Sequence, residues 1–421
     1  MKYKEALGYL EYLQEFRIKL GLERMRALSE ILGHPWRSYY YIIIAGTNGK
    51  GSVGAFLTSI LSKRYRVGFN SSPHLVSPRE RIRLNGHAIS EEDFGFFIGK
   101  VARASEKINY RFPHPVTFFE TLTAAAMLAF QEWDVDVGIF EVGMGGRLDA
   151  TNIADENMSI LTEIDLDHTR HLGKTVEEIA KEKAFVIKNG ISVIGTEKDS
   201  VKKIFQERAE SRGVKSRIVF SENNFRILEP MHKFWFKGED EYVFSPSLPG
   251  NHQGRNASIA ISAAEELKEQ GFSISKEDIL SGVSSAFWPG RLETAGKITL
   301  DGVHNCHASI SVGRYLEETG PWDTMIFTIM RDKDYRCMGR NLFPHFKRII
   351  LTEVESRRKM PAEQLLPLAS RYAEVHIEKN PYDALSLAGE MSRGKIFVGG
   401  SLYLIGKIRE RLLEEGVVDR L

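Results

Sequence analysis

The segment Gly46–Ser52, with the sequence GTNGKGS, constrains the fold of this chain more than any other segment. It follows Tyr39–Ala45, whose β-branched and aromatic residues predict a buried strand, and it opens Gly51–Lys63, which has helical periodicity. Glycines at a strand-to-helix turn let backbone amides point inward, Lys50 supplies a cation, and Ser52 offers a hydroxyl at the helix start. We interpret Gly46–Ser52 as a phosphate loop, with an ordinary glycine-rich turn as the alternative.

The phosphate loop does not match the strict pattern G-x-x-x-x-G-K-[ST]. That pattern requires a glycine where Ile44 stands and a serine or threonine where Gly51 stands. A phosphate loop also names no reaction by itself, because switches, motors and kinases all use one. The chain has neither a guanine-specific N-K-x-D motif nor a kinase catalytic loop. The rest of the site must therefore come from other segments.

Strand-like and helix-like segments alternate along most of the chain, which predicts an α/β fold with parallel sheets and right-handed crossovers. Asn85-Gly86 predicts a two-residue hairpin turn. Thr175 and Glu178 have capping-box spacing and predict a helix that carries Lys183. The segment Arg217–Phe244 has short strands and no long helix, so we expect a β insertion there.

A second α/β run follows Pro289-Gly290 and is long enough to fold alone. We expect a boundary near Arg291–Ala295 and two domains, 1–292 and 293–421. The strands expected in the second domain lie near Lys297–Asp301, Thr324–Thr328, Arg348–Leu351, Glu374–Ile377 and Lys395–Val398.

Composition limits the partners and the compartment. The 421-residue chain carries 57 Lys and Arg against 56 Asp and Glu, so nothing in its net charge predicts binding to nucleic acid or a membrane surface. Met1–Glu5 leads into an amphipathic segment, and the apolar stretches are too short to span a bilayer, so we expect a cytoplasmic protein without a secretory signal. Cys306 and Cys337 form no C-x-x-C motif, which fits a reducing compartment and argues against a disulfide framework or a cysteine-based zinc site.

Carboxylates follow predicted strands in both halves of the chain. Glu141 ends one strand, and Asp301 with His304 follows another. Ligands bind at the carboxyl ends of parallel strands, and magnesium needs few protein oxygens, so Glu141 plus a hydroxyl would suffice to hold it. Two such sites predict a cleft between the domains. The alternative is that each carboxylate only caps a turn.

The polar run Asp165–His171 places His168 and His171 at i, i+3. That spacing could suggest zinc, but no further His or Cys lies at ligand spacing, so we disfavour a zinc site. A plain hydrogen-bonding role is the usual outcome for a histidine in a polar loop.

Taken together, these segments resemble the folylpolyglutamate synthase and dihydrofolate synthase family of the Mur ligase superfamily. The resemblance runs nearly end to end, and the stretches EVGMGGRLDATN and PGRLE are highly specific. It is carried by Leu20–Arg24, Gly46–Ser52, Ser71–Leu75, Arg79–Arg83, Thr117–Glu120, Glu141–Asn152, Asp167-His168, Leu172–Thr175, Ile179–Ala184, His252-Gln253, Asn256-Ala257, Pro289–Glu293, Asp301–Asn305, Asp332–Tyr335 and Gly400–Tyr403.

The resemblance implies a P-loop NTPase-like Mur ligase central domain and a Rossmann-like C-terminal domain, acting as a monomer without nucleic-acid or membrane partners. It also implies ATP-dependent addition of L-glutamate to a reduced folate, with dihydropteroate as a second acceptor in some members. A carboxylate is a poor electrophile, so the acceptor would first take the γ-phosphoryl group of ATP to give an acyl phosphate. The protein would then chiefly position groups and neutralise charge.

Residue roles carry over position by position from the resemblance. Groups expected to act on the reacting centre are Lys50, Lys183 and His304, and those expected to contact ATP are Gly49, Lys50, Gly51, Ser52, Asn256, Arg291 and Asp301. Residues matching magnesium ligands are Ser72, Glu141 and His168. Lys183 matches a lysine that is carbamylated in similar enzymes. The pterin-side pocket would be formed by Thr117, Phe118, Phe119, Glu120, Leu148, Asp149 and Ala150, with core packing as the alternative for the two phenylalanines.

Two positions depart from the family pattern, and two other functions stay open. Cys306 stands where proline is usual, and Phe185 stands where glycine is common and could disturb the helix face beside Lys183. One alternative is a Mur-type ligase acting on another carboxylate, such as a cell-wall nucleotide-peptide. That would need an extra amino-terminal domain, and the phosphate loop lies too near the start to leave room for it. The other alternative is a nucleotide-regulated binding protein without turnover.

Overall fold

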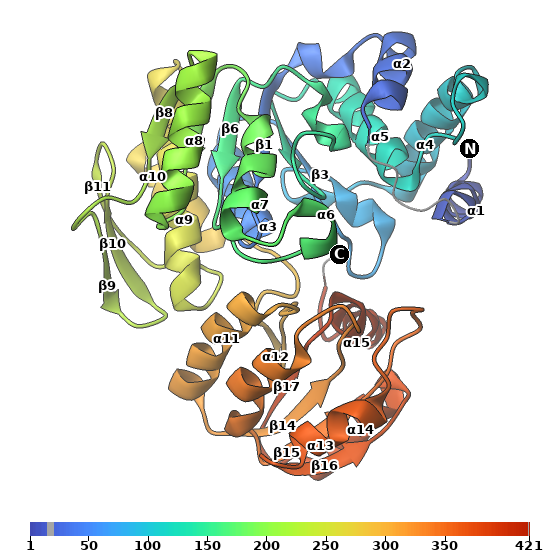
Figure 1. Cartoon of the computed structure of the whole chain (residues 1–421), viewed down its shortest axis with the longest axis vertical. Coiled ribbons are helices and arrows are strands. Elements are labelled where there is room, and N and C mark those ends of the chain that lie inside the picture. Colours follow the sequence, from blue (N-terminus) through green and yellow to red (C-terminus); the bar gives the residue numbers. More distant parts are fainter. Residues whose placement is uncertain (15–20, 420) are drawn as a thin grey trace.

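The computed structural model describes residues 1–14, 21–419 and 421. Leu20 of the resembling segment Leu20–Arg24 lies outside the described residues, as does the side chain of Arg170. The described part has two large sheets, each from one half of the chain and each flanked by helices (Figure 1). None of the helices described is long and apolar enough to cross a membrane.

The first sheet has eight strands in the order β4-β3-β2-β5-β1-β6-β7-β8. Six of them run parallel, and the hairpin β3–β4 adds an antiparallel edge. Asn85 and Gly86 both have positive φ (48° and 83°), as a two-residue hairpin turn requires, so that prediction is confirmed. The strands are β1 (Tyr40–Ala45), β2 (Val67–Asn70), β3 (Ile82–Leu84), β4 (His87–Ala88), β5 (Val137–Glu141), β6 (Met158–Leu161), β7 (Ile191–Ile194) and β8 (Lys215–Ile218).

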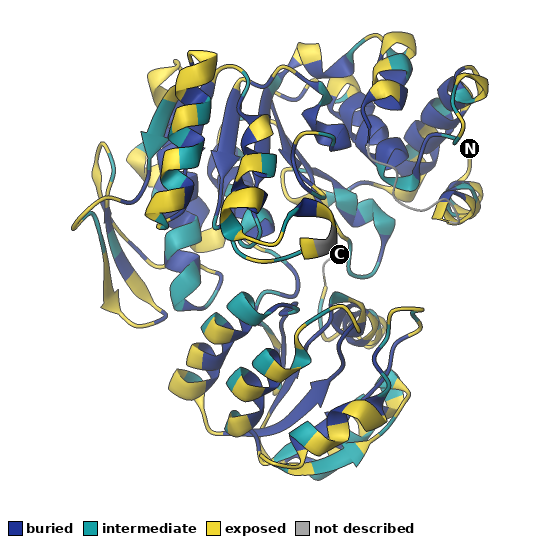
Figure 2. Ribbon diagram, viewed as in Figure 1, coloured by how far each residue is buried: buried dark blue, intermediate teal, exposed yellow. Residues whose placement is uncertain are grey.

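Helices cover both faces of this sheet, which explains why the central strand β1 is apolar throughout. Ile42 and Ile44 point to one face, which is covered by α3 (Lys50–Leu61), α9 (Asn251–Glu269) and α10 (Lys276–Ser285). Tyr41 and Ile43 point to the other face, and Figure 2 shows the strands buried between the two layers. The second layer contains α1 (Tyr3–Gln14), α2 (Glu23–Leu32), α4 (Glu91–Glu106), α5 (Phe118–Glu132), α7 (Val176–Lys183) and α8 (Asp199–Arg212), and a short α6 (Thr169–Leu172) precedes α7.

The expected β insertion is a separate three-stranded antiparallel sheet of β9 (Phe225–Glu229), β10 (Lys233–Lys237) and β11 (Glu241–Phe244). Its inner side chains, among them Phe234 and Phe236, pack on the core under α9. The start of the insertion was expected too early, because Arg217 lies in β8 and pairs in parallel with β7. β8 is an edge strand with partly exposed, charged side chains, so its pattern did not distinguish it from an insertion strand.

The second sheet has the order β12-β13-β17-β14-β15-β16, parallel except for β12. One face carries α11 (Cys306–Thr319), α12 (Tyr335–Leu342) and α13 (Ala362–Ala369), and the other carries α14 (Pro381–Met391) and α15 (Leu402–Glu414). This is the α/β arrangement expected for the second half; the domain limits 1–292 and 293–421 stay a proposal. The strands are β12 (Glu293–Ala295), β13 (Ile298–Leu300), β14 (Trp322–Phe327), β15 (Arg348–Leu351), β16 (Glu374–Ile377) and β17 (Lys395–Gly399).

The expectation against a disulfide was wrong. Cys306 and Cys337 are bonded to each other, with their Cα atoms 5.6 Å apart. The residues are 31 positions apart in the chain, and only the packing of α11 beside α12 brings them together. Sequence spacing gave no sign of that contact.

Candidate functional site

A cavity of about 1390 Å³ lies between the two large sheets. Its walls come from both halves of the chain and include the phosphate loop, the end of β5, the linker at Arg291 and the segment Asp301–His304. Every residue that the sequence singled out for catalysis, ATP, metal or pterin contacts this one cavity. Residues from separate strands meet here because the carboxyl ends of parallel strands share an edge of each sheet.

The phosphate loop is held tightly between β1 and α3. Thr47 N donates to Glu163 O at 2.8 Å, and the Thr162 hydroxyl donates to Asn48 O at 2.7 Å. A side chain at Gly46 would overlap the Thr162 hydroxyl, so the loop lies directly against β6. Helix α3 begins at Lys50, so its unpaired amides and its dipole face the cavity and favour an anion.

Glu141 is a buried carboxylate with unused acceptor capacity. It accepts a hydrogen bond from Ser72 N at 3.1 Å and lies 4.0 Å from Lys50 Nζ. Burial raises the pKa of Glu141, and the Lys50 charge opposes this rise. A buried carboxylate facing a cavity with few protein donors suits a hard cation, so Ser72 and Glu141 fit magnesium in their chemistry.

His168 is the exposed member of the expected magnesium set. Its backbone is left-handed (φ 50°), and its amide donates to Asp167 Oδ1 at 2.8 Å. Partial burial lowers the pKa of His168, and the nearby Asp167 carboxylate opposes that shift. A neutral imidazole at the cavity edge is able to ligate a metal.

Lys183 is the last residue of α7 and is buried, with 5% of its surface exposed. Burial, assisted by the charge on Lys50, lowers the pKa of Lys183 to about 7. A large fraction of this side chain is therefore a neutral amine at neutral pH. The expectation that Phe185 disturbs the helix face was wrong, because Phe185 lies past the helix end with Arg147 and Arg208 over its ring.

Asp301 and His304 are buried on the C-terminal side of the cavity. Asp301 accepts from Leu292 N at 3.0 Å and Val303 N at 2.8 Å, and burial raises its pKa to about 6. His304 Nδ1 donates to Gly302 O at 2.8 Å, and burial lowers the pKa of His304 to about 4.

The remaining expected ATP contacts, Asn256 and Arg291, both line the cavity. The Asn256 amide lies so close to Gly49 that an added Cβ there would be 2.5 Å from its oxygen. Arg291 lies equally close to Gly302, because a Cβ added at Gly302 would be 2.5 Å from Arg291 Nη1. Both side chains therefore reach the cavity from the junction between the two halves.

Two carboxylates expected in the pterin pocket are already occupied by protein donors. Asp149 accepts four hydrogen bonds, from Gly143 N, Met144 N and both the amide and hydroxyl of Thr151, and so fixes the turn after β5. Glu120 pairs with Arg24 at 3.0 Å and completes a capping box with Thr117. Phe118, Phe119, Leu148 and Ala150 leave an apolar wall.

The sequence did not single out Arg81 and His74. The Arg81 guanidinium donates to His74 Nδ1 at 2.9 Å and lies over the Phe118 ring. Burial lowers the pKa of His74 to about 3, so this imidazole is a neutral acceptor. Both residues lie within the resembling segments, but no local pattern assigned them a role.

The sequence also did not predict the contacts that connect the two halves of the chain at the cavity. Asn48 of the phosphate loop accepts from Asn305 Nδ2 at 3.0 Å and donates to His307 Nδ1 at 3.1 Å. Lys333 Nζ lies 2.6 Å from Asp167 Oδ1, and Lys333 is in the segment Asp332–Tyr335 that carried part of the resemblance.

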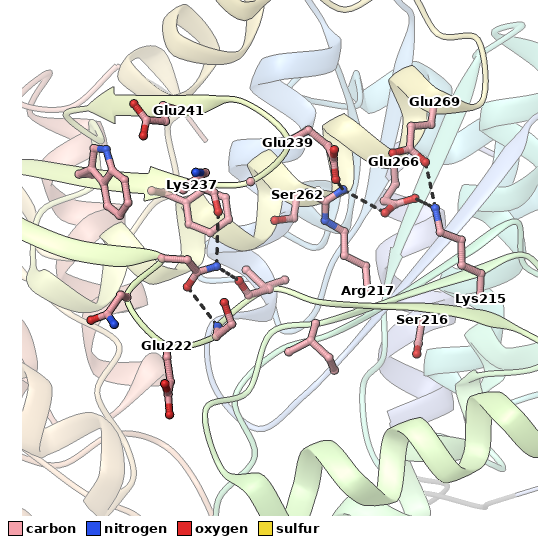
Figure 3. Close-up of a pocket in the computed structure, with 18 residues that line it drawn as sticks. Lys215, Ser216, Arg217, Glu222, Lys237, Glu239, Glu241, Ser262, Glu266 and Glu269 are labelled. Carbon is pink, nitrogen blue, oxygen red and sulfur yellow. Dashed lines mark hydrogen bonds and ion pairs between the residues drawn. The ribbon is translucent and has the colours of Figure 1, made fainter.

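A second, smaller cavity of about 710 Å³ lies between β8, α9 and the insertion sheet (Figure 3). Lys215 pairs with Glu266 and Glu269, and Arg217 pairs with Glu239 and Glu266. Lys215 and Arg217 are thus already neutralised by neighbouring carboxylates, and we assign this cavity no role.

The family model described as the Mur ligase middle domain matches residues 44–264. The dihydrofolate synthase/folylpolyglutamate synthase of Bacillus subtilis is 33% identical and covers 97% of this chain and 99% of its own length. The protein of the same description from Escherichia coli is 31% identical, covering 96% of this chain and 94% of that protein.

Solved structures match over nearly the whole chain. Folylpolyglutamate synthase from Thermotoga maritima has a TM-score of 0.86 at 32% identity, with 98% of each chain covered. Mycobacterium tuberculosis folylpolyglutamate synthase complexed with ADP has a TM-score of 0.88 at 28% identity, covering 97% of this chain and 98% of that one. Escherichia coli FolC in complex with DHPP and ADP has a TM-score of 0.87 at 27% identity, with 98% of each chain covered.

Proposed function

Because this chain belongs to the folylpolyglutamate synthase and dihydrofolate synthase family, we propose that its large cavity is where L-glutamate is joined to a folate. The chain is an ATP-dependent ligase of folates and glutamate. The observation that carries the assignment to this cavity is that all the expected site residues line it, although they come from segments spread over both domains.

The first step is transfer of the ATP γ-phosphoryl group to the terminal carboxylate of the folate. The amides at the start of α3 and the Lys50 ammonium would hold the transferring phosphate. Gly49, Gly51 and Ser52 would cradle the phosphates, while Asn256, Arg291 and Asp301 would fix the nucleotide from the domain junction. Ser72, Glu141 and His168 would hold Mg²⁺, which when bound offsets charge on the phosphate oxygens.

Lys183 is suited to carbamylation. With its pKa lowered to about 7, its amine has a free lone pair near neutral pH and can attack the carbon of carbon dioxide. The new N–C bond forms as a proton leaves nitrogen, and the product is a carbamate anion in place of an ammonium. An anion would be compatible with the cation site beside it, whereas two ammonium groups, Lys50 and Lys183, repel each other.

In the second step the glutamate amine attacks the acyl phosphate and inorganic phosphate leaves. His304 has a low pKa and is neutral, so it would orient the amine as a hydrogen-bond acceptor and not as a strong base. Phe118, Phe119, Leu148 and Ala150 would hold the pterin side of the acceptor, with Thr117, Glu120 and Asp149 shaping the wall behind them.

The test uses purified protein with ATP, Mg²⁺ and L-glutamate, and compares tetrahydrofolate with dihydropteroate as acceptor. ADP release is measured together with the mass of the product. Release of ADP with a product one glutamate heavier is the expected result, and the two acceptors show whether both family activities are present. Absence of ADP release with both acceptors would overturn the proposal.

A further inference from the structure

The disulfide lies next to residues that connect the two halves of the chain at the cavity. Cys306 is the first residue of α11, and Cys337 lies in the first turn of α12. The two helices also touch elsewhere, because the Asn341 amide donates to Ser309 Oγ at 2.9 Å. A Cβ at Gly313 would lie 2.6 Å from Asn341 O, so the helices are in close contact.

The residues on either side of Cys306 hold the phosphate loop. Asn305, just before it, donates to the Asn48 side-chain oxygen, and His307, just after it, accepts from the Asn48 side-chain nitrogen. Asn305 also caps α11 by accepting from Ala308 N. The start of α11 therefore fixes the orientation of the Asn48 side chain, whose backbone is held by Thr162 and Glu163.

The loop before α12 contacts a second segment of the cavity wall. Lys333 and Asp167 form an ion pair at 2.6 Å in which each side chain is only 11% exposed. His304 Nε2 also lies 3.9 Å from Asp167 Oδ2. Asp167 precedes His168 and accepts its backbone amide, so Lys333 helps to fix the position of His168.

We propose that the Cys306–Cys337 disulfide is a positioning element for catalysis, which locks the Asn305–His307 turn and the Lys333 loop together over the phosphate loop. The proposal rests on the ligase function proposed above. Reduction by a dithiol proceeds by thiol–disulfide exchange: the Sγ–Sγ bond breaks, two protons and two electrons pass to the cysteines, and the dithiol becomes a disulfide. Turnover then falls, because the covalent link between the Lys333 loop and the turn that contacts Asn48 is lost.

The reduced protein remains folded in this account. Cys306 and Cys337 lie outside the buried core of the second domain, where α11 and α12 bury Val312, Leu316 and Met338 against the sheet. Reduction instead changes the relative position of the Asn305–His307 turn and the loop that carries Lys333. A displacement of a fraction of an ångström at a reacting centre is enough to lower a rate about tenfold, while leaving the binding of ATP largely intact.

The experiment measures turnover of the full-length enzyme before and after treatment with dithiothreitol. Titration with a chromogenic disulfide should find no free thiol before treatment and two afterwards. We expect kcat to fall about five- to twentyfold with little change in the KM for ATP, and to recover on reoxidation with oxidised glutathione. The variant Cys337→Ser should match the reduced wild type and should not respond to dithiothreitol.

A second variant separates positioning from simple stabilisation. In the Lys333→Ala background, reduction should no longer lower kcat, because the contact through which the disulfide acts is already absent. Equal kcat in the oxidised and reduced wild type, or two free thiols before any treatment, would overturn this inference and leave the ligase function intact. Absence of ADP release from the oxidised enzyme would instead overturn the ligase function.

Discussion

Replacing Lys183 with methionine should stabilise the protein while abolishing ligation. Lys183 has an ordinary pKa of 10.5 when the chain is unfolded and a pKa of about 7 in the folded cavity. The unfolded state therefore binds the proton more tightly, and this favours unfolding at any pH below 10.5. At pH 7 the difference corresponds to about 4 kcal/mol, and methionine, which carries no charge, removes it.

The sign of the effect sets its pH dependence. Below pH 7 both states are protonated and the destabilisation is complete; between pH 7 and 10.5 it shrinks; above 10.5 both states are neutral and it vanishes. The advantage of Lys183→Met over wild type should therefore be largest below pH 7, still about 4 kcal/mol at pH 7, and nearly absent near pH 11. Lys181→Met, at an exposed position on the same helix, is the matched control and should change stability little at any pH.

The assay is equilibrium urea unfolding followed by circular dichroism at several pH values, in buffers freed of carbon dioxide. Added bicarbonate should then stabilise wild type but not Lys183→Met, because only the lysine can form a carbamate. A difference below about 1 kcal/mol at pH 7, or one that does not shrink with rising pH, would refute the burial argument. Full ligase activity in Lys183→Ala would remove the carbamate from the mechanism.

Three other substitutions test separate parts of the molecule. Glu141→Gln should lower turnover at least about 100-fold while ADP binding, measured by calorimetry, is largely kept; a variant with normal turnover would contradict the role of this carboxylate. Gly46→Ala should lower the free energy of unfolding by about 1–3 kcal/mol and weaken ADP binding, because the added methyl group overlaps the Thr162 hydroxyl. Arg409→Met should lower the free energy of unfolding in urea by about 3–5 kcal/mol, because the Glu293 carboxylate loses its ion-pair partner at 2.9 Å. The double variant Arg409→Met/Glu293→Leu should be more stable than Arg409→Met alone. If it is not, the carboxylate left without its ion-pair partner is not the cause of the destabilisation.

Much of the fold could be predicted because its signals are local. Tyr39–Ala45 is apolar on both faces because both faces of β1 are covered, and Thr175 with Glu178 forms the capping box that starts α7. The gathering of site residues also followed from a general rule. Glu141 and Asp301 end or follow strands of parallel sheets, and such strand ends share an edge.

The features that sequence reasoning missed depend on how distant segments dock. Lys333 and Asp167 are 166 positions apart, and Cys306 meets Cys337 only because α11 packs beside α12. The charge state of Lys183 could not be predicted either, because its lowered pKa comes from burial that no local sequence pattern shows. Asp149 is a case in which local contacts decide. The resemblance assigned this carboxylate to the pterin pocket, but it accepts four hydrogen bonds from residues of the turn in which it lies.

The strand order of the second sheet has a consequence for synthesis of the protein. β17, the last strand in the chain, lies between β13 and β14, so those two strands have no common partner until residue 399 has been made. The first sheet, by contrast, is complete at Ile218 and its helices at Ser285. We therefore expect the amino-terminal half to fold on the ribosome, whereas the second sheet can form only after β17 has been synthesised. Stalled nascent chains ending near residue 380 should then contain a protease-resistant first half and a protease-sensitive second half.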